Sequence, residues 1–414
     1  MTSQLRRVQL VVVGALLATF GIAPRLWLEH PLFAPIPITQ GFPTLPPPMD
    51  ALVLGILVLL LVLITFVREP RWWIVSWCVL LALRTFWDRV TWQPYLLQYS
   101  FMLFSIALAR RRPDSRSPVG ADGGAAVDPS YRVLEANRLI VAAVYFWSGV
   151  SKFGYANMVE MPRRAAEFMP AWLPVGLITA LWAFAPFFEI AIAVGLLSAR
   201  ARRLAVVGAI VMHVGVLIFL GPFGFGHNQV IWPWNVVMVL LNVILFWPRD
   251  EMTTQTLSRV RLFLTGNRHV FHKVVVVVFG VCPFFSYVGL WSPYLSFRMY
   301  SASVEQGLVA LTPAAIDGLP DELREGAPTR RQEGRGFVTV HLARWGEEVL
   351  NAFPPPDRAV YYTIARRVCD LTTEPDGVRL ILRHLPDLFT GERQETIESC
   401  AELSGGSDAT KQSE

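Results

Sequence analysis

The chain has 414 residues, of which 53% are hydrophobic, 12% aromatic and only 17% charged, and its mean hydropathy is +0.42. This composition leaves too little polar surface for a soluble protein of this size, so we expect the lipid bilayer to solvate most of it. Residues 1–292 carry 24 Lys and Arg against 13 Asp and Glu, whereas residues 293–414 carry 13 against 19. The basic excess lies in short loops and forms no continuous patch, which argues against a nucleic-acid partner.

Nine apolar segments approach the roughly 20 residues that a helix needs to cross the hydrocarbon core of a bilayer. They are residues 7–24, 49–67, 71–89, 93–110, 137–156, 176–198, 203–221, 229–247 and 270–291. The third and fourth are interrupted by charge and by Pro94, which is typical of a tight helical hairpin or a re-entrant element. The pattern predicts an all-α polytopic membrane helix bundle with about nine transmembrane helices.

The segments fall into two groups, residues 1–110 with helices 1 to 4 and residues 137–292 with helices 5 to 9. Residues 111–136 are rich in Pro, Gly, Ser and Asp near their start and are predicted to be a flexible cytoplasmic linker. Residues 154–175 alternate Met and aromatic residues with charged ones, which indicates a short helix lying in the outer membrane interface.

Arginine and lysine collect in the loops that face the cytoplasm if the N-terminus is inside. Under the positive-inside rule, nine spans then place the C-terminal part on the extracytoplasmic side, which in a bacterium is the periplasmic face of the inner membrane.

Residues 293–403 are expected to form a small α+β extracytoplasmic domain, followed by a disordered tail over residues 404–414. A strand is predicted at 336–343, and helical runs at 356–369 and near 377–385. Cys369 and Cys400 both lie in this domain, where an oxidising compartment would allow a disulfide between them. His341, His384 and Asp370 are expected to be surface residues, because no spacing links them to a nucleophile or a metal.

Polar residues inside the apolar segments are costly and therefore informative. Arg84 and Asp88 are four residues apart on one helical face and are expected to pair. Glu189 and His213 lie at similar depths in two adjacent antiparallel segments, and a hydrogen bond between them would explain both residues without any chemistry.

Lys152 is unusual because the chain has only three lysines against 34 arginines. A lysine buried without a permanent counter-ion loses its charge more easily than an arginine, so we expect a lowered pKa and a role as a base. The alternative is an interfacial lysine whose ammonium group reaches the lipid headgroups.

The stretch YFWSGVSKF, which ends just after Lys152, resembles the aromatic-small-Gly-x-x-Lys segment of the vitamin K-dependent γ-carboxylase-like family, whose membrane part is the horizontally transferred transmembrane domain (HTTM). FWDRVTWQPYLLQYSFMLF is similar to the helical hairpin of that family. The segment from GLLSARARR to VILFW resembles its Arg-rich turn, mid-helix His and aromatic-Pro-aromatic motif. The similarity covers about residues 70–250, and the redox-associated DoxX and MauE membrane proteins look like more distant relatives.

The chain departs from the carboxylase pattern at Gln93-Pro94, where the family has Asn-His, and its C-terminal domain is too short for the family's substrate machinery. Protein carboxylation is therefore not expected. What the resemblance still implies is an outward-facing aromatic cavity that binds a membrane quinone or quinol, with these residues around it: Lys152, Trp147, Trp232, Trp234, Asn235 and His213. An interfacial tryptophan belt is the alternative explanation for the indoles.

Two classes of function follow. The first is a carboxylase-like or quinone-linked redox enzyme of the membrane, with Lys152 as catalytic base and His213 or Glu189 accepting or stabilising the proton. The second is a non-catalytic membrane scaffold that recruits an extracytoplasmic protein partner through its C-terminal domain. No metal-ligand cluster is recognisable in the sequence.

Overall fold

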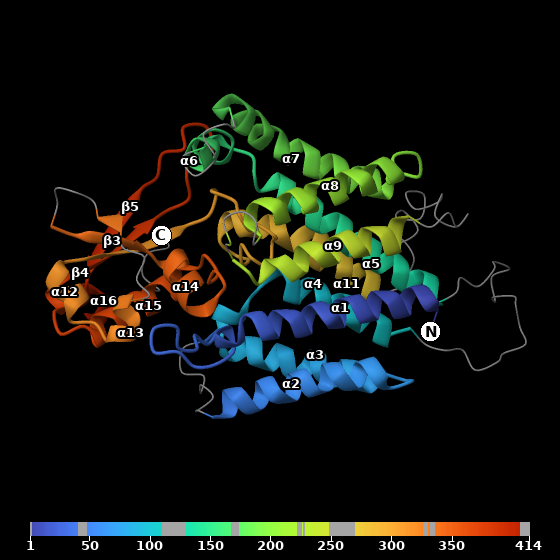
Figure 1. Cartoon of the computed structure of the whole chain (residues 1–414), viewed down its shortest axis with the longest axis horizontal. Coiled ribbons are helices and arrows are strands. Elements are labelled where there is room, and N and C mark those ends of the chain that lie inside the picture. The colour runs from blue at the N-terminus through green and yellow to red at the C-terminus, as the bar shows by residue number, and fades with distance from the viewer. Residues whose placement is uncertain are drawn as a thin grey trace, which may run out of the picture.

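The computed structural model describes residues 2–39, 48–109, 129–166, 174–221, 226, 228–247, 270–325, 330–331 and 336–405. Long helices form a bundle, and a small sheet with short helices lies against one end of it (Figure 1). The division between bundle and C-terminal domain thus follows the change in hydropathy along the sequence.

Within the described parts of the chain, six helical stretches are long and apolar enough to cross a membrane. They are α1 (Ser3–Ile22), α2 (Met49–Phe66), α5 (Pro129–Val150), α7 (Val175–Leu197), α8 (Arg202–Leu220) and the continuous stretch Val270–Val288, composed of α11 (Val270–Val275), the π-helix η5 (Val276–Val281) and the 3-10 helix η6 (Cys282–Val288). The prediction of a multi-pass helical membrane protein is therefore confirmed in outline.

The predicted count of about nine spans is not confirmed. Helices α3 (Arg71–Trp87), α4 (Pro94–Ala107) and α9 (Ile231–Phe246) have 17, 14 and 16 residues. At about 1.5 Å per residue they extend roughly 21 to 26 Å, less than the hydrocarbon thickness of about 30 Å. The segment between α3 and α4 is a structured turn that includes η2 (Arg89–Thr91).

The predicted linker needs correction, because α5 begins at Pro129 and residues 129–136 are helical rather than flexible. Val133, Leu134 and Ala136 are buried, which supplies an apolar face that the polar composition of this stretch concealed. Farther along the same helix, Arg138 is also buried and donates from Nε to the carbonyl of Leu245 at 2.7 Å. Residues 110–128 lie outside the described part of the chain.

The predicted interfacial segment begins as a helix. The π-helix η3 (Ala156–Glu160) continues into α6 (Met161–Ala166), which packs against α7. Residues 167–173 are not among the described residues.

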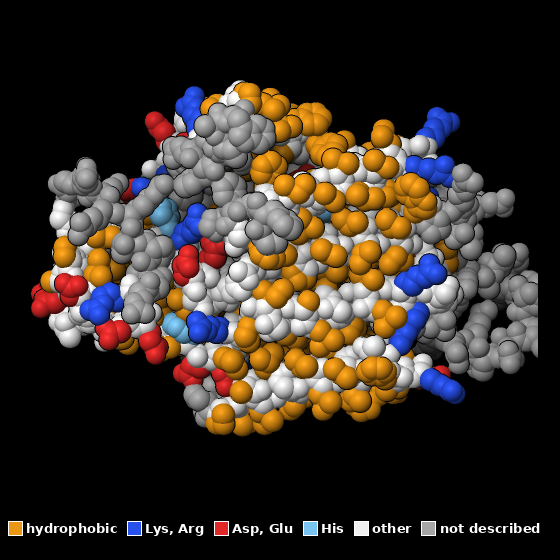
Figure 2. All heavy atoms as spheres, viewed as in Figure 1, with side chains coloured by type: hydrophobic (Ala, Val, Ile, Leu, Met, Phe, Trp, Pro, Cys, Tyr) orange, Lys and Arg blue, Asp and Glu red, His pale blue; other side chains and the backbone are white. Residues whose placement is uncertain are grey.

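The outside of the bundle is apolar. Leu181 and Phe184 of α7, and Val211 and Ile218 of α8, each expose more than half of their side chains, and Figure 2 shows hydrophobic side chains over the visible length of the helices. In the same view, Lys and Arg gather at the end of the bundle farthest from the sheet (Figure 2). This is the surface expected of helices surrounded by lipid with polar ends.

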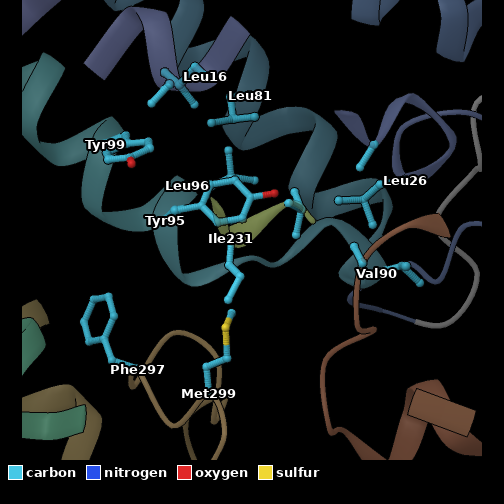
Figure 3. Close-up of a cluster of buried hydrophobic side chains, with 14 of the residues drawn as sticks. Leu16, Leu26, Leu81, Val90, Tyr95, Leu96, Tyr99, Ile231, Phe297 and Met299 are labelled. Carbon is cyan, nitrogen blue, oxygen red and sulfur yellow. The ribbon is translucent and has the colours of Figure 1, made fainter. Parts of the chain in front are cut away.

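A single core connects the bundle with the segment that leads into the C-terminal domain. Tyr95 and Tyr99 of α4 are fully buried, with side chains from α1, α3, α9 and residues 297–299 in the same cluster (Figure 3). The C-terminal domain therefore begins inside the packing of the bundle and is not joined to it by a free linker.

Arg84 and Asp88 pair as predicted, at 3.1 Å, with both side chains 3% exposed. Asp88 also accepts from the backbone N–H of Ile36 at 3.2 Å and of Val90 at 2.9 Å, while Arg84 donates to the carbonyl of Trp27. This pair fixes the turn between α3 and α4 against the loop after α1.

The C-terminal domain contains a five-stranded antiparallel sheet in the order β2-β3-β1-β4-β5. The strands are β1 (Gln306–Leu311), β2 (Arg330–Arg331), β3 (Val338–His341), β4 (Val378–Arg383) and β5 (Glu395–Ser399). The helices are α12 (Pro313–Asp317), α13 (Asp321–Glu325), α14 (Leu342–Leu350), α15 (Arg358–Leu371) and α16 (Cys400–Gly405).

The predicted strand at 336–343 and helix at 356–369 are confirmed as β3 and α15. The predicted helical run at 377–385 is wrong, because these residues form the strand β4. Val378, Leu380 and Leu382 are buried and alternate with less buried residues, which is the period of a strand. The domain is therefore α+β, as expected.

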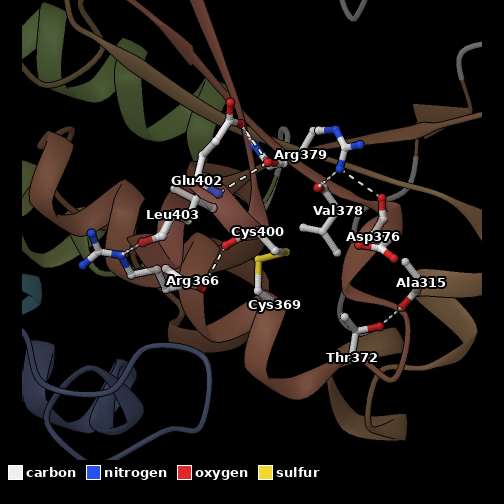
Figure 4. The surroundings of a disulfide bond; sticks show 12 residues. Ala315, Arg366, Cys369, Thr372, Asp376, Val378, Arg379, Cys400, Glu402 and Leu403 are labelled. Carbon is white, nitrogen blue, oxygen red and sulfur yellow. Dashed lines mark hydrogen bonds between the residues drawn. A yellow bond between two sulfur atoms is a disulfide. The ribbon is translucent and has the colours of Figure 1, made fainter. Parts of the chain in front are cut away.

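The disulfide between Cys369 and Cys400 is present and joins the last turn of α15 to the start of α16. Around it, Arg366 donates to the carbonyl of Leu403, and Thr372 donates to that of Ala315 (Figure 4). Residues 404 and 405 of the predicted disordered tail complete α16, and residues 406–414 lie outside the described part.

Candidate functional site

Helices α5 and α7 approach each other closely at Gly149. A Cβ atom at this position would lie 2.8 Å from the carbonyl oxygen of Pro186 and 2.9 Å from the side chain of Ile190. Only glycine allows this contact without displacement. One face of α5 carries Tyr145, Ser148 and Lys152, which are spaced three and four residues apart. Close packing at Gly149 brings this face of α5 against α7.

The contact brings Lys152 to Glu189. The Nζ atom of Lys152 lies 2.9 and 3.0 Å from the two carboxylate oxygens of Glu189, and it also donates to the hydroxyl of Ser148 at 2.7 Å. The two charged side chains are 16% and 11% exposed. The expectation that Lys152 lacks a permanent counter-ion is therefore wrong, because the sequence separation of 37 residues concealed its partner.

His213 belongs to a different cluster. Its Nδ1 atom lies 2.7 Å from Oδ1 of Asn235, and its Nε2 atom lies 2.7 Å from the hydroxyl of Tyr145, which accepts from Nδ2 of Asn242 at 2.6 Å. With an amide oxygen at Nδ1, that nitrogen carries the proton and Nε2 accepts from Tyr145. The resulting chain of donors runs from Asn242 through Tyr145 and His213 to Asn235.

This chain of hydrogen bonds engages both ring nitrogens of His213. It joins α5, α8 and α9 and explains His213 as a structural residue. The expected Glu189–His213 hydrogen bond is not among the contacts of the described residues, since Glu189 bonds to Lys152 instead. The prediction rested on depth along the helices, and depth does not tell which side of a helix a residue is on.

The three tryptophans of the expected aromatic cavity donate to three different elements. Trp147 donates to the carbonyl of Phe279 in η5, Trp232 to the carbonyl of Leu220 at the end of α8, and Trp234 to the side chain of Gln98 in α4. Each indole N–H lies 2.8 or 2.9 Å from its acceptor. These bonds account for the tryptophans as ties between helices.

A pocket lies elsewhere, between the end of α1, the residues Gly226, Asn228 and Gln229, and α14. Its volume is about 500 Å³, and neither Lys152 nor any of the three tryptophans lines it. Glu347 at its wall accepts from the backbone N–H of Asn228 at 2.6 Å. Among the described residues, no group of three His, Cys, Asp or Glu side chains is placed to hold a metal ion.

Asn157 was missed by the sequence reasoning, although it is central to the join between the two parts of the chain. Its Nδ2 donates to the hydroxyl of Ser303 at 2.6 Å, and its Oδ1 accepts from the N–H of Ala302 at 2.6 Å. Ser301 donates to the carbonyl of Ser151, next to Lys152. No local pattern signals this role, because the partners are about 145 residues away.

The site therefore consists of an ammonium and a carboxylate side by side at the end of α5, held by a glycine contact on one side and by the entry to the C-terminal domain on the other. Such a pair donates and accepts hydrogen bonds at the same place. No protein-family model, curated protein or solved structure matches the chain.

Proposed function

We propose that the chain is a membrane protein that binds a lipid-soluble quinol or quinone and exchanges a proton with it at the Lys152–Glu189 pair. The observation that carries the proposal is the pair itself, a partly exposed ammonium and carboxylate 2.9 Å apart among apolar helices. Ionisable residues within apolar helices are costly, and by default they indicate a function.

The residues fit the polar edge of such a ligand. The Nζ group of Lys152 would donate to a quinone oxygen, and the carboxylate of Glu189 would accept from a quinol hydroxyl. The bound ligand would supply the redox chemistry. The pocket between α1 and α14 is not lined by these residues, so we propose that the ring lies in the surrounding lipid rather than in an internal aromatic cavity.

The pair also changes the role assigned to Lys152. Nζ of Lys152 donates to both carboxylate oxygens of Glu189, and these oxygens have further lone pairs that can accept from a ligand. The carboxylate is therefore the proton acceptor in the proposal, and Lys152 is the group that positions it. The hydroxyl of Ser148 accepts a further hydrogen of the ammonium. Proton transfer to the carboxylate requires the ligand hydroxyl within about 3 Å.

The first experiment is mass spectrometry of the lipophilic molecules that the protein retains after gentle detergent extraction. We expect a quinone or quinol with the natural sequence and its loss in Lys152→Ala and Glu189→Gln. Lys273→Ala is the matched control, because this exposed lysine lies at the start of the Val270–Val288 stretch and should not affect retention. Equal retention in all four proteins would refute the site.

Exchanging Lys152 for arginine separates the two possible bases. Arginine keeps the positive charge but does not act as a base. If Glu189 accepts the proton, Lys152→Arg should keep part of the proton exchange with the quinol, and Glu189→Gln should lose that exchange. If Lys152 is the base, both variants should be inactive.

We also propose that the C-terminal domain is extracytoplasmic, which in a bacterium is the periplasmic side of the inner membrane. Support comes from the Lys and Arg side chains at the opposite end of the bundle (Figure 2) and from the positive-inside rule. Alkaline phosphatase should be active when fused after residue 300 and inactive when fused after residue 120. The reverse pattern would place the domain in the cytoplasm.

The second candidate is a non-catalytic scaffold that recruits an extracytoplasmic protein. Its support is the firm attachment of the C-terminal domain, through Asn157 and through the bond from Gln93 to the carbonyl of Phe353 at 3.0 Å. Full function of a Lys152→Ala strain, with normal amounts of protein in the membrane, would favour this candidate over the first.

A further inference from the structure

The loop between β4 and β5 carries the most exposed aromatic side chain of the C-terminal domain. Phe389 is 86% exposed, and its neighbours Leu388 and Leu385 are 54% and 40% exposed. Folded domains seldom place three large apolar residues on one loop in water, and such a patch usually marks an interaction site.

The loop is a defined turn that presents Phe389 outward. Oδ1 of Asp387 accepts from the backbone N–H of Phe389 and of Thr390, each at 2.8 Å. The N–H of Asp387 donates to the carbonyl of Glu392 at 2.9 Å, and Gly391 closes the turn at φ +76°. The hydrogen bonds hold the backbone, so the exposure of Phe389 is a feature of the fold.

The same turn is attached to the helical bundle. The N–H of Tyr155 donates to the carbonyl of Leu388 at 2.8 Å, and the side chain of Leu388 approaches Gly154. A Cβ at Gly391 would lie 2.6 Å from the ring of Tyr155, so this contact requires glycine. The loop thus lies two or three residues from Lys152, where α5 ends and η3 begins.

This point is close to the start of the lipid-facing surface. Helix α6 follows η3 and packs against α7, and Figure 1 shows the β4–β5 loop beside α6 near the first turns of α7. Val175 and Leu177 in the first turn of α7 are 56% and 47% exposed, continuous with the apolar face farther along α7. The loop is therefore near the boundary where lipid first covers α7.

We propose that the β4–β5 loop inserts Phe389 and the neighbouring leucines into the headgroup region of the outer leaflet, as a second membrane attachment of the C-terminal domain. Phe and Leu gain free energy on leaving water, by about 25 cal/mol per Å² of apolar surface. The carboxylate of Asp387 is occupied by its own turn, and Glu392 is exposed and can remain in water. A bilayer is the favoured partner because the turn is bonded to Tyr155, at the end of the bundle where the apolar face of α7 begins.

The test is spin-label accessibility in the full chain reconstituted into phosphatidylcholine vesicles. Cys78 and Cys282 are replaced by alanine, the Cys369–Cys400 disulfide is kept, and a label is attached through Phe389→Cys. The control is Asp376→Cys, an exposed residue before β4 at the opposite end of that strand, about 20 Å away by strand geometry.

We expect the ratio of accessibility to oxygen, which partitions into lipid, over a water-soluble nickel chelate to be above unity at 389 and below unity at 376. A ratio below unity at 389 would overturn the proposal by placing the loop in water. Low accessibility to both reagents would also overturn it, since a protein surface would then cover the loop. A second label at Leu385→Cys, away from the turn hydrogen bonds, guards against a local disturbance by the 389 label. Its ratio of oxygen to nickel-chelate accessibility should also be above unity.

Discussion

Gly149→Ala tests the geometry that creates the candidate site. The added methyl group would lie 2.8 Å from the carbonyl oxygen of Pro186 and 3.1 Å from Cβ of Glu189. The nearest atom belongs to the backbone and cannot rotate away, so α5 and α7 must separate. The Lys152–Glu189 pair spans the same contact and should be disturbed with it.

The expected magnitude is the balance of two opposing effects. Replacing a helical glycine with alanine stabilises a helix by about 0.5 to 1 kcal/mol, whereas adding a methyl group to a close-packed contact costs about 1 to 3 kcal/mol. The second effect should dominate, because the clash is with backbone, and leave a net loss of up to about 2.5 kcal/mol. Gly14→Ala is the control, because a methyl group there meets nothing within 4 Å, and it should be neutral or slightly stabilising.

The assay is the free energy of unfolding from SDS titration in mixed micelles, followed by quinone retention on the same preparations. We expect Gly149→Ala to unfold at lower SDS and to lose the ligand, while Gly14→Ala retains both properties. If Gly149→Ala were as stable as Gly14→Ala, the close approach of α5 and α7 would be refuted. If it were destabilised but still retained the ligand, the pair would not be the binding site.

Three further predictions concern stability and acid sensitivity. Arg84→Met leaves the buried Asp88 without its counter-ion and should cost about 3 to 5 kcal/mol in the same titration, whereas Arg324→Met, which breaks an exposed pair with Asp321, should cost about 1 kcal/mol or less. Replacing Cys369 and Cys400 together by serine removes a cross-link between residues 31 positions apart. The free energy of unfolding should fall by about 3 to 4 kcal/mol, because the unfolded chain gains loop entropy. An unchanged unfolding curve would argue against the bond. Hydrogen bonds from the N–H groups of Thr390 and Phe389 hold the pKa of Asp387 below its ordinary value of 3.8. The ionised carboxylate therefore stabilises the turn fully above pH 3.8. This stabilisation is lost as the pH falls through the lower pKa of the folded state. A spin label at 389 should then become more mobile, and Asp387→Asn should remove this pH dependence.

The sequence predicted what depends on composition and local spacing. A helical membrane bundle follows from the length and hydropathy of its segments, and the Arg84–Asp88 pair follows from a spacing of four residues on one helix. The strand β4 was predicted to be a helix because its sequence, VRLILR, is short. A run of six apolar and charged residues fits both the two-residue period of a strand and the 3.6-residue period of a helix. Residues 129–136 were assigned to a linker because their polar side chains concealed a buried face.

The candidate site was predicted only in part, for a geometric reason. Lys152 and Glu189 were both singled out as costly polar residues, but Glu189 was matched to His213 by depth alone. Rotation of a residue about its helix axis decides which neighbour it meets, and this angle depends on packing at positions such as Gly149. Asn157 gave no sequence signal, because its partners belong to a segment that follows the last helix of the bundle.

The central claim is that Glu189, held by Lys152, accepts a proton from a quinol. Infrared difference spectroscopy of the reconstituted protein measures this directly when a short-chain benzoquinol is added. We predict that the quinol shifts the carboxylate stretching band of Glu189 in the natural sequence, because the carboxylate accepts the quinol hydroxyl, and that this band change is absent in Glu189→Gln. A difference spectrum without this band change, or one in which the band change persists in Glu189→Gln, would contradict the account.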